Sequence, residues 1–579
     1  MKGLNSCKKK KCKKSKKKRC FYIPYYPKAS CVDRRFRDNS ARIRSALGKI
    51  EEGPFTLLKE FTAEDLRYKN LGYLGSFTKS LEHDPITGTL TEPKEYEKLV
   101  KALFRSDQEL LASVKLADGA VQLLVNPTAA FSSVIQGGAQ NKFVVPNPPT
   151  LSSDAAAAEM VEVYSEAVAR DIPFCEYSTD ATIATLLDTN RLNAPNVLAN
   201  LPFPPSNPLT PKTVFRGDAD GCILGPYISQ LLLVKVPTSD KTFYEQKYTT
   251  YFPRGNPAHR VEWGVNAAEM ISIQNGIPTG PDPALDTPRY IYNGRTLAEA
   301  VHNDAGFQYY YQAALILLSV GAPTNPDFPS FQNQCSFITG DGMVNIVTAL
   351  AGVSRLAFQH AWYWKWIIYR RLRPEAYSLW VHNVKSATVP NAGNYDLSNV
   401  ILNNEVLENI KKINSGWGFL DSWTLPLCYR EGSPVHPSYL AGHSTVATAC
   451  VTILKMFFQC DIPWESLPRL DRLVDPPGVV EANNTGDTLD SYTEPDASEL
   501  TVGTELNKLA YNVSLGRCWA GVHYRTDTYN KVGEEIAKSY MGDLLATSSE
   551  NNLPGNTPPS ITFRNFAGEL ETVFPSTCN

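Results

Sequence analysis

The sequence predicts an all-α fold of packed helical bundles, with long loops and a few short strands. Three observations predict it. Apolar segments of helical length dominate the chain after residue 296. Segments of strand character are short, and no repeat of roughly 20 to 50 residues is visible. The 579 residues, of which 43% are hydrophobic and 20% charged, supply enough apolar surface for a large core.

In the first half of the chain, Pro-rich loops separate the expected elements. A helical stretch is expected in EYEKLVKALFRSDQELLASVKLA, residues 95–117. The first clean helix begins in SSDAAAAEMVEVYSEAVARD, with Asp154 as its N-cap, and a shorter one follows in TDATIATLLDTNRL. Between about residues 195 and 260, LLLVKV and TFYEQKYTTYF are the expected short strands.

Helices dominate from residue 296 onward. TLAEAVHNDAGFQYYYQAALILLSVG is expected to form one buried helix, which opens with a capping box of Thr296 and Glu299. A second long helix should run from about Met343 to Arg373 and end there, because Pro374 cannot continue it. Later helices are expected near residues 402–414, 443–459, 501–520 and 524–546.

A basic arm precedes an acidic body. Residues 1–20 hold eleven of the 57 Lys and Arg residues and no acid, which leaves 46 basic against 59 acidic residues in the remainder. Because such dense like charge buries nothing, the arm, assigned to residues 1–35, is predicted to be disordered when unbound. It suits nucleic acid or another anionic partner, and it is equally consistent with a solubility tail or a nuclear localisation signal.

The cysteines and the hydropathy pattern bear on the compartment. Of the 12 cysteines, Cys7, Cys12, Cys20 and Cys31 lie in the arm at spacings that fit no standard zinc pattern. The others are scattered singly, which favours buried thiols over a disulfide framework. The sequence has no run of about 18 or more apolar residues, so a transmembrane helix is not expected. A secretory signal is not expected either, because no apolar segment follows the charged start. These features favour an intracellular location without identifying the compartment.

Three segments combine residues that support chemistry, namely residues 362–377, 436–445 and 516–527. They contain Lys365, Arg373, His436, Gly442, His443, Arg517, His523 and Asp527. Gly442 allows the backbone to approach a ligand closely, and the N–H groups at the start of the following helix suit an anion. Together, two arginines, a lysine and a helix start can hold a tetrahedral oxyanion, with histidines for acid–base or covalent chemistry.

The third segment carries a geometric constraint of its own. His523 and Asp527 are four residues apart, so on a helix they share a face, and the carboxylate can fix one imidazole nitrogen while the other keeps its lone pair. Arg517 lies six residues before His523, about 240° around an ideal helix. Both can face one site only if the helix breaks between them, and Gly521 is placed to break it.

These segments resemble the vanadium-dependent haloperoxidases. The patterns K-x7-RP, HPSYxxGH and R-x5-H-x3-D are typical of this family, which shares its anion site with type 2 phosphatidic acid phosphatases and bacterial acid phosphatases. EGSPVHPSY and TPRYIYNGRTLAEAVHNDAGFQYYYQA are similar to the algal and cyanobacterial bromoperoxidase branch. The resemblance extends from about residue 40 to 550, and the basic arm has no counterpart in it.

The resemblance implies two packed four-helix bundles within a helical domain over residues 36–550. The N-terminal half would span about 36–290, and the C-terminal bundle, with the site at its end, about 291–550. A Pro-, Ser- and Asn-rich tail, residues 551–579, would follow. Members of the branch form dimers and larger homo-oligomers. Some relatives bind a structural calcium ion, for which FPSFQNQCSFITGDG, residues 328–342, is the corresponding loop.

The resemblance also implies a vanadate cofactor and a reaction. Lys365, Arg373 and Arg517 would hold the vanadate oxygens together with the backbone N–H of Gly442, and Lys365 would also assist catalysis. The implied enzyme oxidises halide, with bromide or iodide favoured, using hydrogen peroxide. Its product would be a hypohalite-type species that halogenates organic acceptors.

The remaining site residues receive roles from the same resemblance. His523 would be the axial vanadium ligand, supported by Asp527, and His443 would be the acid–base residue. His436 matches a histidine typical of bromoperoxidases. Trp362 falls where the family places a side chain near the halide, although a core aromatic is an equally good interpretation of it.

One position departs from the family pattern. Ala441 stands where the family usually has a serine whose hydroxyl donates a hydrogen bond to the oxyanion. Losing one hydrogen bond to a charged group costs roughly 1.5 to 3 kcal/mol, or about ten- to a hundredfold in affinity. The sequence therefore predicts weaker vanadate binding than the family norm.

Two alternatives remain open at this stage. One is a phosphomonoesterase at the same anion site, in which His523 attacks phosphorus and His443 protonates the leaving alkoxide. The other is a catalytically weakened structural or nucleic-acid-associated relative, which the missing serine and the basic arm both favour. Retention of the charged residues argues against the second alternative, since such groups are costly to bury without a use.

Overall fold

The structure is a computed structural model. It describes residues 59–576 apart from 133, 135, 141, 240–241, 252–259, 282–283, 330–332, 476 and 549–558. The expected basic arm and its four cysteines lie outside the described residues.

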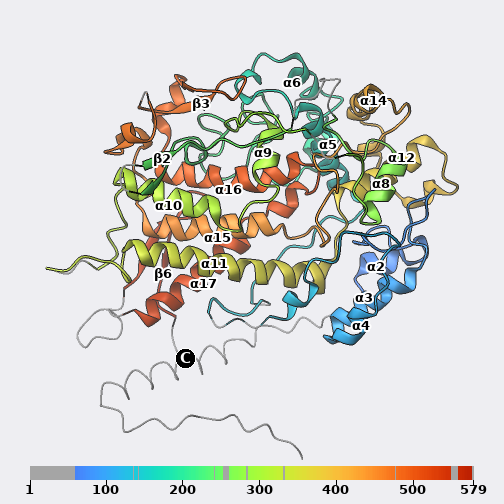
Figure 1. The fold of residues 1–579 in the computed structure, drawn as a ribbon, viewed down its shortest axis with the longest axis horizontal. Coiled ribbons are helices and arrows are strands. Elements are labelled where there is room, and N and C mark those ends of the chain that lie inside the picture. Colours follow the sequence, from blue (N-terminus) through green and yellow to red (C-terminus); the bar gives the residue numbers. More distant parts are fainter. Residues whose placement is uncertain are drawn as a thin grey trace, which may run out of the picture. The chain divides into compact units, whose positions relative to one another are not determined.

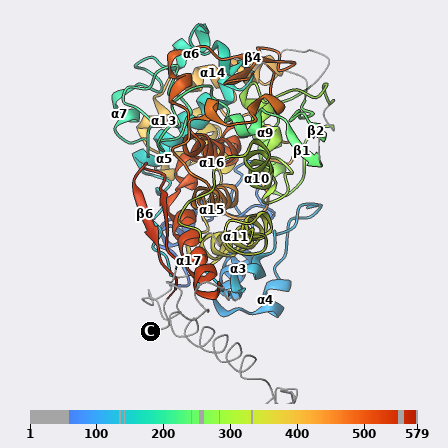
Figure 2. The same ribbon diagram turned by 90° about the vertical axis from the view of Figure 1, so that its left-hand side faces the viewer.

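A bundle of long helices forms around α15 (Gly442–Phe457). This helix contacts α11 (Met343–Tyr363), α16 (Val502–Trp519) and α17 (Lys531–Thr547), and it lies between α16 and α11 in both views (Figure 1, Figure 2). α10 (Gln308–Val320) packs against α11 and α15. Nearly every residue of α15 is buried, as expected for an apolar helix surrounded by others. Its N-terminus is therefore held in place from several sides.

A second group of helices surrounds α5 (Asp154–Ala169), which is also buried along almost its whole length. α5 contacts α7 (Pro195–Leu198), α13 (Asn399–Leu402), α14 (Val406–Gly416) and α16. Because α16 contacts both α5 and α15, it joins the two groups. Buried carboxylates on α5 consequently reach the segment that follows α16.

The other elements are short. The further α-helices are α2 (Ala63–Arg67), α3 (Pro93–Arg105), α4 (Gln108–Ala112), α6 (Ala181–Leu186), α8 (Ala267–Gln274), α9 (Gly294–Ala300) and α12 (Pro374–Ser386). The 3-10 helices are η1 (Lys69–Leu71), η2 (Pro127–Phe131), η3 (Phe174–Glu176), η4 (Gln230–Leu232), η6 (Ala392–Tyr395), η7 (Trp464–Ser466), η8 (Leu470–Arg472), η9 (Pro495–Glu499) and η10 (Arg525–Thr528). A π-helix, η5 (Trp364–Tyr369), continues α11.

Three antiparallel two-stranded sheets complete the described structure. They pair β1 (Val236–Ser239) with β2 (Thr242–Tyr244), β3 (Val480–Ala482) with β4 (Leu489–Ser491), and β5 (Ile561–Arg564) with β6 (Leu570–Val573). The predicted all-α class with a few short strands is confirmed. The segment expected as a C-terminal tail contains the β5–β6 hairpin, which contacts α15 and α17.

The predicted single helix after residue 296 is two helices. α9 ends at Ala300 and α10 begins at Gln308, with Asp304 in the turn between them. The expected capping box was wrong, because the Asn293 side chain caps α9 by accepting from the Thr296 N–H. Ser153, one residue before the expected Asp154, likewise caps α5.

The long helix expected up to Arg373 ends earlier. α11 passes into η5, and Arg370 then adopts a left-handed conformation with φ of 45°. Pro374 begins α12 at its first position, where a missing N–H costs nothing, so it starts a helix and does not stop one. LLLVKV is also largely not a strand, since η4 occupies Gln230–Leu232 and β1 starts at Val236.

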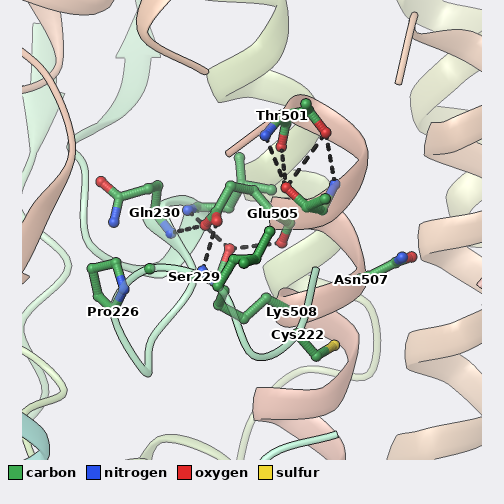
Figure 3. A network of polar contacts seen from close by, with 12 residues as sticks. Cys222, Pro226, Ser229, Gln230, Thr501, Glu505, Asn507 and Lys508 are labelled. Carbon is green, nitrogen blue, oxygen red and sulfur yellow. Dashed lines mark hydrogen bonds and ion pairs between the residues drawn. The ribbon is translucent and has the colours of Figure 1, made fainter. Parts of the chain in front are cut away.

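The N-terminus of α16 is fixed by a buried polar network (Figure 3). Gln230 donates its backbone N–H to Glu505 Oε2 at 2.6 Å, and Ser229 donates its hydroxyl to the Glu505 carbonyl at 2.8 Å. Lys508 Nζ pairs with Glu505 Oε1 at 2.7 Å. Both charges are buried and paired, so this end of α16 is fixed in position. The orientation of the helix, and with it the position of its C-terminal end, is fixed as well.

Two further expectations concern cysteines and membrane spans. Among the described cysteines, Cys222, Cys428, Cys450, Cys460 and Cys518 are buried free thiols, as predicted, whereas Cys175 and Cys335 are exposed. A search of the described residues finds no helix both long and apolar enough to cross a membrane.

Candidate anion-binding site

The turn after η5 positions Lys365 and Arg373. Lys365 lies within the π-helix, and Arg373 is the extended residue just before α12. Both side chains are almost completely buried. The left-handed Arg370 ends η5 between them, and the two cations reach the same loop, residues 436–438.

Arg373 binds the histidines of the other two segments. Its Nε and NH2 groups donate to the carbonyl oxygen of His436, and NH2 also donates to His436 Nδ1 at 2.9 Å. Its NH1 group donates to the Val522 carbonyl at 2.8 Å and to His523 Nε2 at 2.7 Å. The guanidinium therefore links all three sequence segments at one point.

Lys365 donates from Nζ to the carbonyl oxygens of Pro437 and Ser438, both at 2.6 Å. An ammonium group carries three N–H donors, so one remains for a ligand. Within the described residues, Lys365 forms no salt bridge. Its amino group is consequently fixed in position without a carboxylate partner in the described part of the chain.

The break predicted at Gly521 is confirmed. α16 ends at Trp519 and Gly521 adopts φ of 81°, a left-handed value that glycine tolerates best. His523 lies in the loop before η10 and not on a helix, so the predicted shared helical face was wrong. The predicted hydrogen bond nevertheless forms, with His523 Nδ1 and Asp527 Oδ2 2.7 Å apart.

Several hydrogen bonds hold the Asp527 carboxylate in place. It accepts hydrogen bonds from the Ser438 hydroxyl, from the Tyr524 N–H and from Arg371 NH1, the last at 3.0 Å. Arg371 also donates to Glu159 of α5 at 2.8 Å. Since the carboxylate accepts from His523 Nδ1–H, Nε2 keeps its lone pair, as a metal ligand or nucleophile requires.

The N-terminus of α15 forms another wall. Ala441 occupies the N-cap position, offers no side-chain cap, and donates its N–H to the Asp527 carbonyl at 3.0 Å. A Cβ atom added to Gly442 would lie 3.3 Å from Phe358 and 3.4 Å from Trp362. A side chain at this position would crowd two aromatic rings, and the Gly442 N–H lies at the helix start, where anions bind.

His443 binds a carboxylate that sequence reasoning missed. His443 Nε2 lies 2.8 Å from Asp304 Oδ1, and the two side chains are 24% and 8% exposed. If Nε2 carries the hydrogen, Nδ1 is left as the basic nitrogen. Asp304 reaches His443 because α9 and α10 are separate helices. A charged residue inside an apolar helical pattern was the available signal for this break.

Arg517 approaches from the end of α16. Its NH1 group donates to the Val301 carbonyl at 2.7 Å, and its guanidinium carbon lies 5.4 Å from the centre of the Tyr429 ring. Arg517 Nε is buried and has no hydrogen-bond partner among the described residues. Arg517 also lines a cavity of about 320 Å³, together with Val125, Val435 and other residues. The cavity therefore reaches the Arg517 side of the site.

Trp362 and His436 lie side by side, with ring centres 4.8 Å apart and planes inclined by 44°. Trp362 Nε1 donates to the Val125 carbonyl at 3.2 Å. Val125 also lines the cavity that Arg517 reaches. An aromatic face, an imidazole and the cations thus adjoin one another.

Burial and like charge set the proton states. Burial, followed by the neighbouring Arg373, lowers the pKa of Lys365 well below its usual range. Burial also lowers the pKa of Arg373 to about 9. Burial and the nearby Arg373 keep the pKa of His523 well below its usual value, and burial with Lys365 and Arg373 does the same to the pKa of His436. Both imidazoles are therefore neutral at pH 7.

The two carboxylates behave in the opposite way. Burial raises the pKa of Asp527, but Arg371 and the hydrogen bonds from His523 and Ser438 outweigh it and hold the pKa below its usual range. Likewise, His443 outweighs burial and lowers the pKa of Asp304. Burial lowers the pKa of His443, and Asp304 partly offsets that shift. Each carboxylate is thus ionised and orients a neutral imidazole.

The structure brings the predicted site residues together. Three buried cations, a helix N-terminus and a neutral imidazole with a free lone pair are suited to an oxyanion that also accepts a nitrogen ligand. In the described part of the chain, no group of three or more His, Cys, Asp or Glu residues is arranged to hold a metal ion. Three residues of the expected calcium loop, 330–332, lie outside that part.

Comparison with known proteins gives consistent matches. A family model described as the VCPO second helical-bundle domain matches residues 421–547. The chain is 32% identical over 518 residues to a vanadium-dependent bromoperoxidase of Ascophyllum nodosum, with 86% of each chain covered. It is 30% identical over 570 residues to a vanadium-dependent bromoperoxidase of Corallina pilulifera, covering 85% of this chain and 92% of that one.

A solved structure is also similar. The second vanadate-dependent bromoperoxidase of Ascophyllum nodosum, described as homohexameric, superposes with a TM-score of 0.79 at 27% identity. The match covers 96% of this chain and 95% of that one. The similarity therefore extends far beyond the three site segments.

Proposed function

This chain belongs to the vanadium-dependent bromoperoxidases, and from that premise we propose that it binds vanadate and oxidises halide with hydrogen peroxide. The product is a hypohalite-type species that halogenates organic acceptors, with bromide or iodide as the favoured halide. One observation carries the proposal: Lys365, Arg373 and Arg517 are buried close together and form no salt bridge within the described residues. A bound anion would offset the cost of burying these unpaired charges.

The residues present fit vanadate. Lys365, Arg373 and Arg517 supply positive charge and N–H donors for its oxygens, and the Gly442 N–H adds a donor at the helix start. His523 Nε2, whose partner nitrogen is held by Asp527, is the atom that would ligate vanadium. In the structure that lone pair accepts a hydrogen bond from Arg373 NH1.

His443 is the proposed acid–base residue. When bound, vanadate supplies a Lewis-acidic centre at which peroxide is activated for attack by halide, without a change in the oxidation state of vanadium. Asp304 orients the imidazole and stabilises its protonated form, so that Nδ1 can take up a proton and return it. The low pKa of His443 keeps this nitrogen unprotonated at the start.

Trp362 and His436 are proposed to border the halide. The neutral His436 ring and the indole of Trp362 present a weakly hydrated surface beside the cations. A large, polarisable halide loses less hydration there than chloride does, which supports the preference for bromide and iodide. Lys365, adjacent to both, contributes the charge that attracts the halide.

The test is reconstitution with orthovanadate. Vanadate binding is measured by isothermal titration calorimetry, and bromination of a phenol-red-type dye is then followed with hydrogen peroxide and bromide. Stoichiometric binding together with turnover is the expected result. Bound vanadate without any turnover would contradict the proposed halide oxidation. Hydrolysis of p-nitrophenyl phosphate by the vanadate-free protein would favour the phosphatase alternative.

Assembly and calcium are lesser parts of the proposal. Because the second Ascophyllum bromoperoxidase is described as homohexameric, we expect this chain to form a homo-oligomer, which light scattering after size-exclusion chromatography would detect. A structural calcium ion at residues 328–342 is expected from the same family likeness. Elemental analysis of the purified protein checks it, and a calcium content below one ion per chain contradicts it.

A further inference from the structure

Four hydroxyl side chains lie on α15, and one of them differs from the others. Thr445, Thr448 and Thr452 each donate to the carbonyl oxygen four residues earlier, at 2.9, 2.8 and 2.7 Å. Ser444 is 1% exposed, and its Oγ has no hydrogen-bond partner among the described residues. Buried hydroxyls without partners are uncommon, so this one calls for an explanation.

The position of Ser444 in the helix explains why it has no local partner. The carbonyl four residues earlier belongs to Leu440, which precedes the N-cap residue Ala441 and lies outside the helix. Ser444 therefore cannot form the hydrogen bond from hydroxyl to preceding helical carbonyl that the three threonines form. Its hydroxyl remains available to a group beyond the end of the helix.

Ser444 lies on the same face of α15 as the missing hydroxyl. Ala441 is the N-cap residue and Ser444 is the third residue of the helix, and side chains at these two positions lie close together in a capping box. Helical side chains also lean toward the N-terminus, so a residue in the first turn projects toward the helix start. The helix start is where Gly442 offers its N–H to the proposed anion.

The packing of α15 against α16 fixes the level at which Ser444 lies along α16. Lys455 Nζ donates to Asn507 Oδ1 of α16 at 2.8 Å, which fixes the level at which the two helices meet. Ser444 precedes Lys455 by eleven residues, about three helical turns, and so faces the same side of α15. The charge of Arg517 acts on His443 at the other end of α15, so α16 runs antiparallel to it and Ser444 lies at the level of Arg517 and Cys518.

Two unpartnered donors therefore occupy the same end of the bundle. Arg517 Nε, like Ser444 Oγ, is buried without a hydrogen-bond partner in the described part of the chain. We propose that the Ser444 hydroxyl replaces the one that Ala441 lacks and donates a hydrogen bond to the bound oxyanion. This inference rests on the proposed function, because it assumes that the anion is vanadate.

The primary test measures vanadate affinity without any turnover. Ser444→Ala is titrated with orthovanadate by calorimetry, and binding is confirmed by vanadium-51 NMR. The dissociation constant is expected to rise about ten- to a hundredfold, as for other hydrogen bonds to a charged group. A change of less than twofold overturns the proposal.

A matched control removes a buried hydroxyl that already has a partner. Ser514 lies on α16 and donates to the Ala510 carbonyl at 2.7 Å. Ser514→Ala is expected to leave the dissociation constant within twofold. If Ser514→Ala weakens binding as much as Ser444→Ala does, the effect is general loosening of the bundle and the proposal is wrong. Thermal unfolding of both variants confirms that they fold.

The second test restores the family hydroxyl. Ala441→Ser is expected to tighten vanadate binding by at least tenfold in the Ser444→Ala background, and by clearly less in the wild-type background. Equal gains in both backgrounds would show that the two hydroxyls do not share a role. Failure of wild-type protein to bind vanadate would instead overturn the proposed function, so the two failures are distinguishable.

Discussion

Two groups of buried cations in this protein differ in their partners and in the direction in which their pKa values are shifted. In the first group, each arginine is paired with a buried carboxylate: Arg525 with Glu162 and Arg371 with Glu159 and Asp527. These contacts more than offset burial and raise the pKa of both arginines. In the second group, Lys365 and Arg373 donate only to carbonyl oxygens and imidazoles, and burial lowers the pKa of both.

We interpret the first group as charges that stabilise the fold and the second group as charges that are available to a bound anion. A buried ion pair is costly to break, because the remaining partner is left charged and desolvated. An unpaired buried cation destabilises the protein. A bound anion stabilises it, because the cation then has a partner of opposite charge. The two groups meet at Asp527, which pairs with Arg371 and orients His523.

The largest effect should come from breaking a pair of the first group. Arg525→Met leaves Glu162 charged and buried, beside Glu166, whose pKa burial and Glu162 raise well above the usual value. We expect the free energy of unfolding to fall by about 3 to 5 kcal/mol, measured by urea denaturation. The exposed pair of Arg564 with Asp461 is the control, and Arg564→Met should cost less than about 1 kcal/mol. Equal losses would contradict the distinction.

Removing a cation of the second group should cost less stability and more vanadate affinity. Arg373→Met removes an unpaired buried charge, which offsets part of the cost of losing its hydrogen bonds, so the unfolding free energy of the vanadate-free protein should fall by less than it does in Arg525→Met. Vanadate affinity should nevertheless fall more than about a hundredfold, since charged hydrogen bonds to the anion are lost. Calorimetry and urea denaturation on the same variant measure both quantities. A variant as unstable as Arg525→Met, with vanadate affinity intact, would reverse the assignment.

The carboxylate of Asp304 should affect catalysis more than folding. Asp304→Asn removes the charge that keeps the pKa of His443 from falling further. We expect kcat/KM for bromide to drop about tenfold, with the acidic limb of its pH profile moved to lower pH. Steady-state bromination between pH 4 and 9 checks the shift. An unmoved profile would mean that His443 is not the group that titrates.

The smallest predicted effect is on the pH dependence of stability. His523 and His436 have folded pKa values below the usual value of about 6.5. Below that pH the unfolded chain takes up protons that the folded chain does not, so stability is lost as pH falls. His436→Gln should reduce the loss between pH 6.5 and 5.5 by about 1 kcal/mol, measured by urea denaturation of the vanadate-free protein. An unchanged slope would indicate that His436 is protonated in the folded state.

Much of the site was predictable because its residues lie where helices start or stop. Gly442 and Gly521 mark such positions by their backbone requirements, so the arrangement of Arg517 against His523 followed from spacing alone. The turn through η5 was not predictable in this way. Pro374 is compatible with either a helix end or a helix start, and a π-helix has no sequence signal that would have selected the second.

The support around the site was less accessible to sequence reasoning. Arg371 and Ser438 lie next to recognised motif residues, but their partner Asp527 is far away in the sequence, and only tertiary packing joins them. Asp304 was hidden inside an apolar pattern that was interpreted as one continuous helix. Periodicity reports which face of a helix is buried, and it does not report a short interruption that leaves the pattern on both sides intact.

The position of α15 has a consequence for the order in which the molecule assembles. α15 packs against α16, α17 and the β5–β6 hairpin, all of which are synthesised after it. Lys365 must therefore remain without its final surroundings until residue 527 has emerged. Contacts between such distant segments are slow to form. Anion binding would then be among the last properties the chain acquires, and recovery of vanadate binding during refolding would report completed packing more faithfully than helical content does.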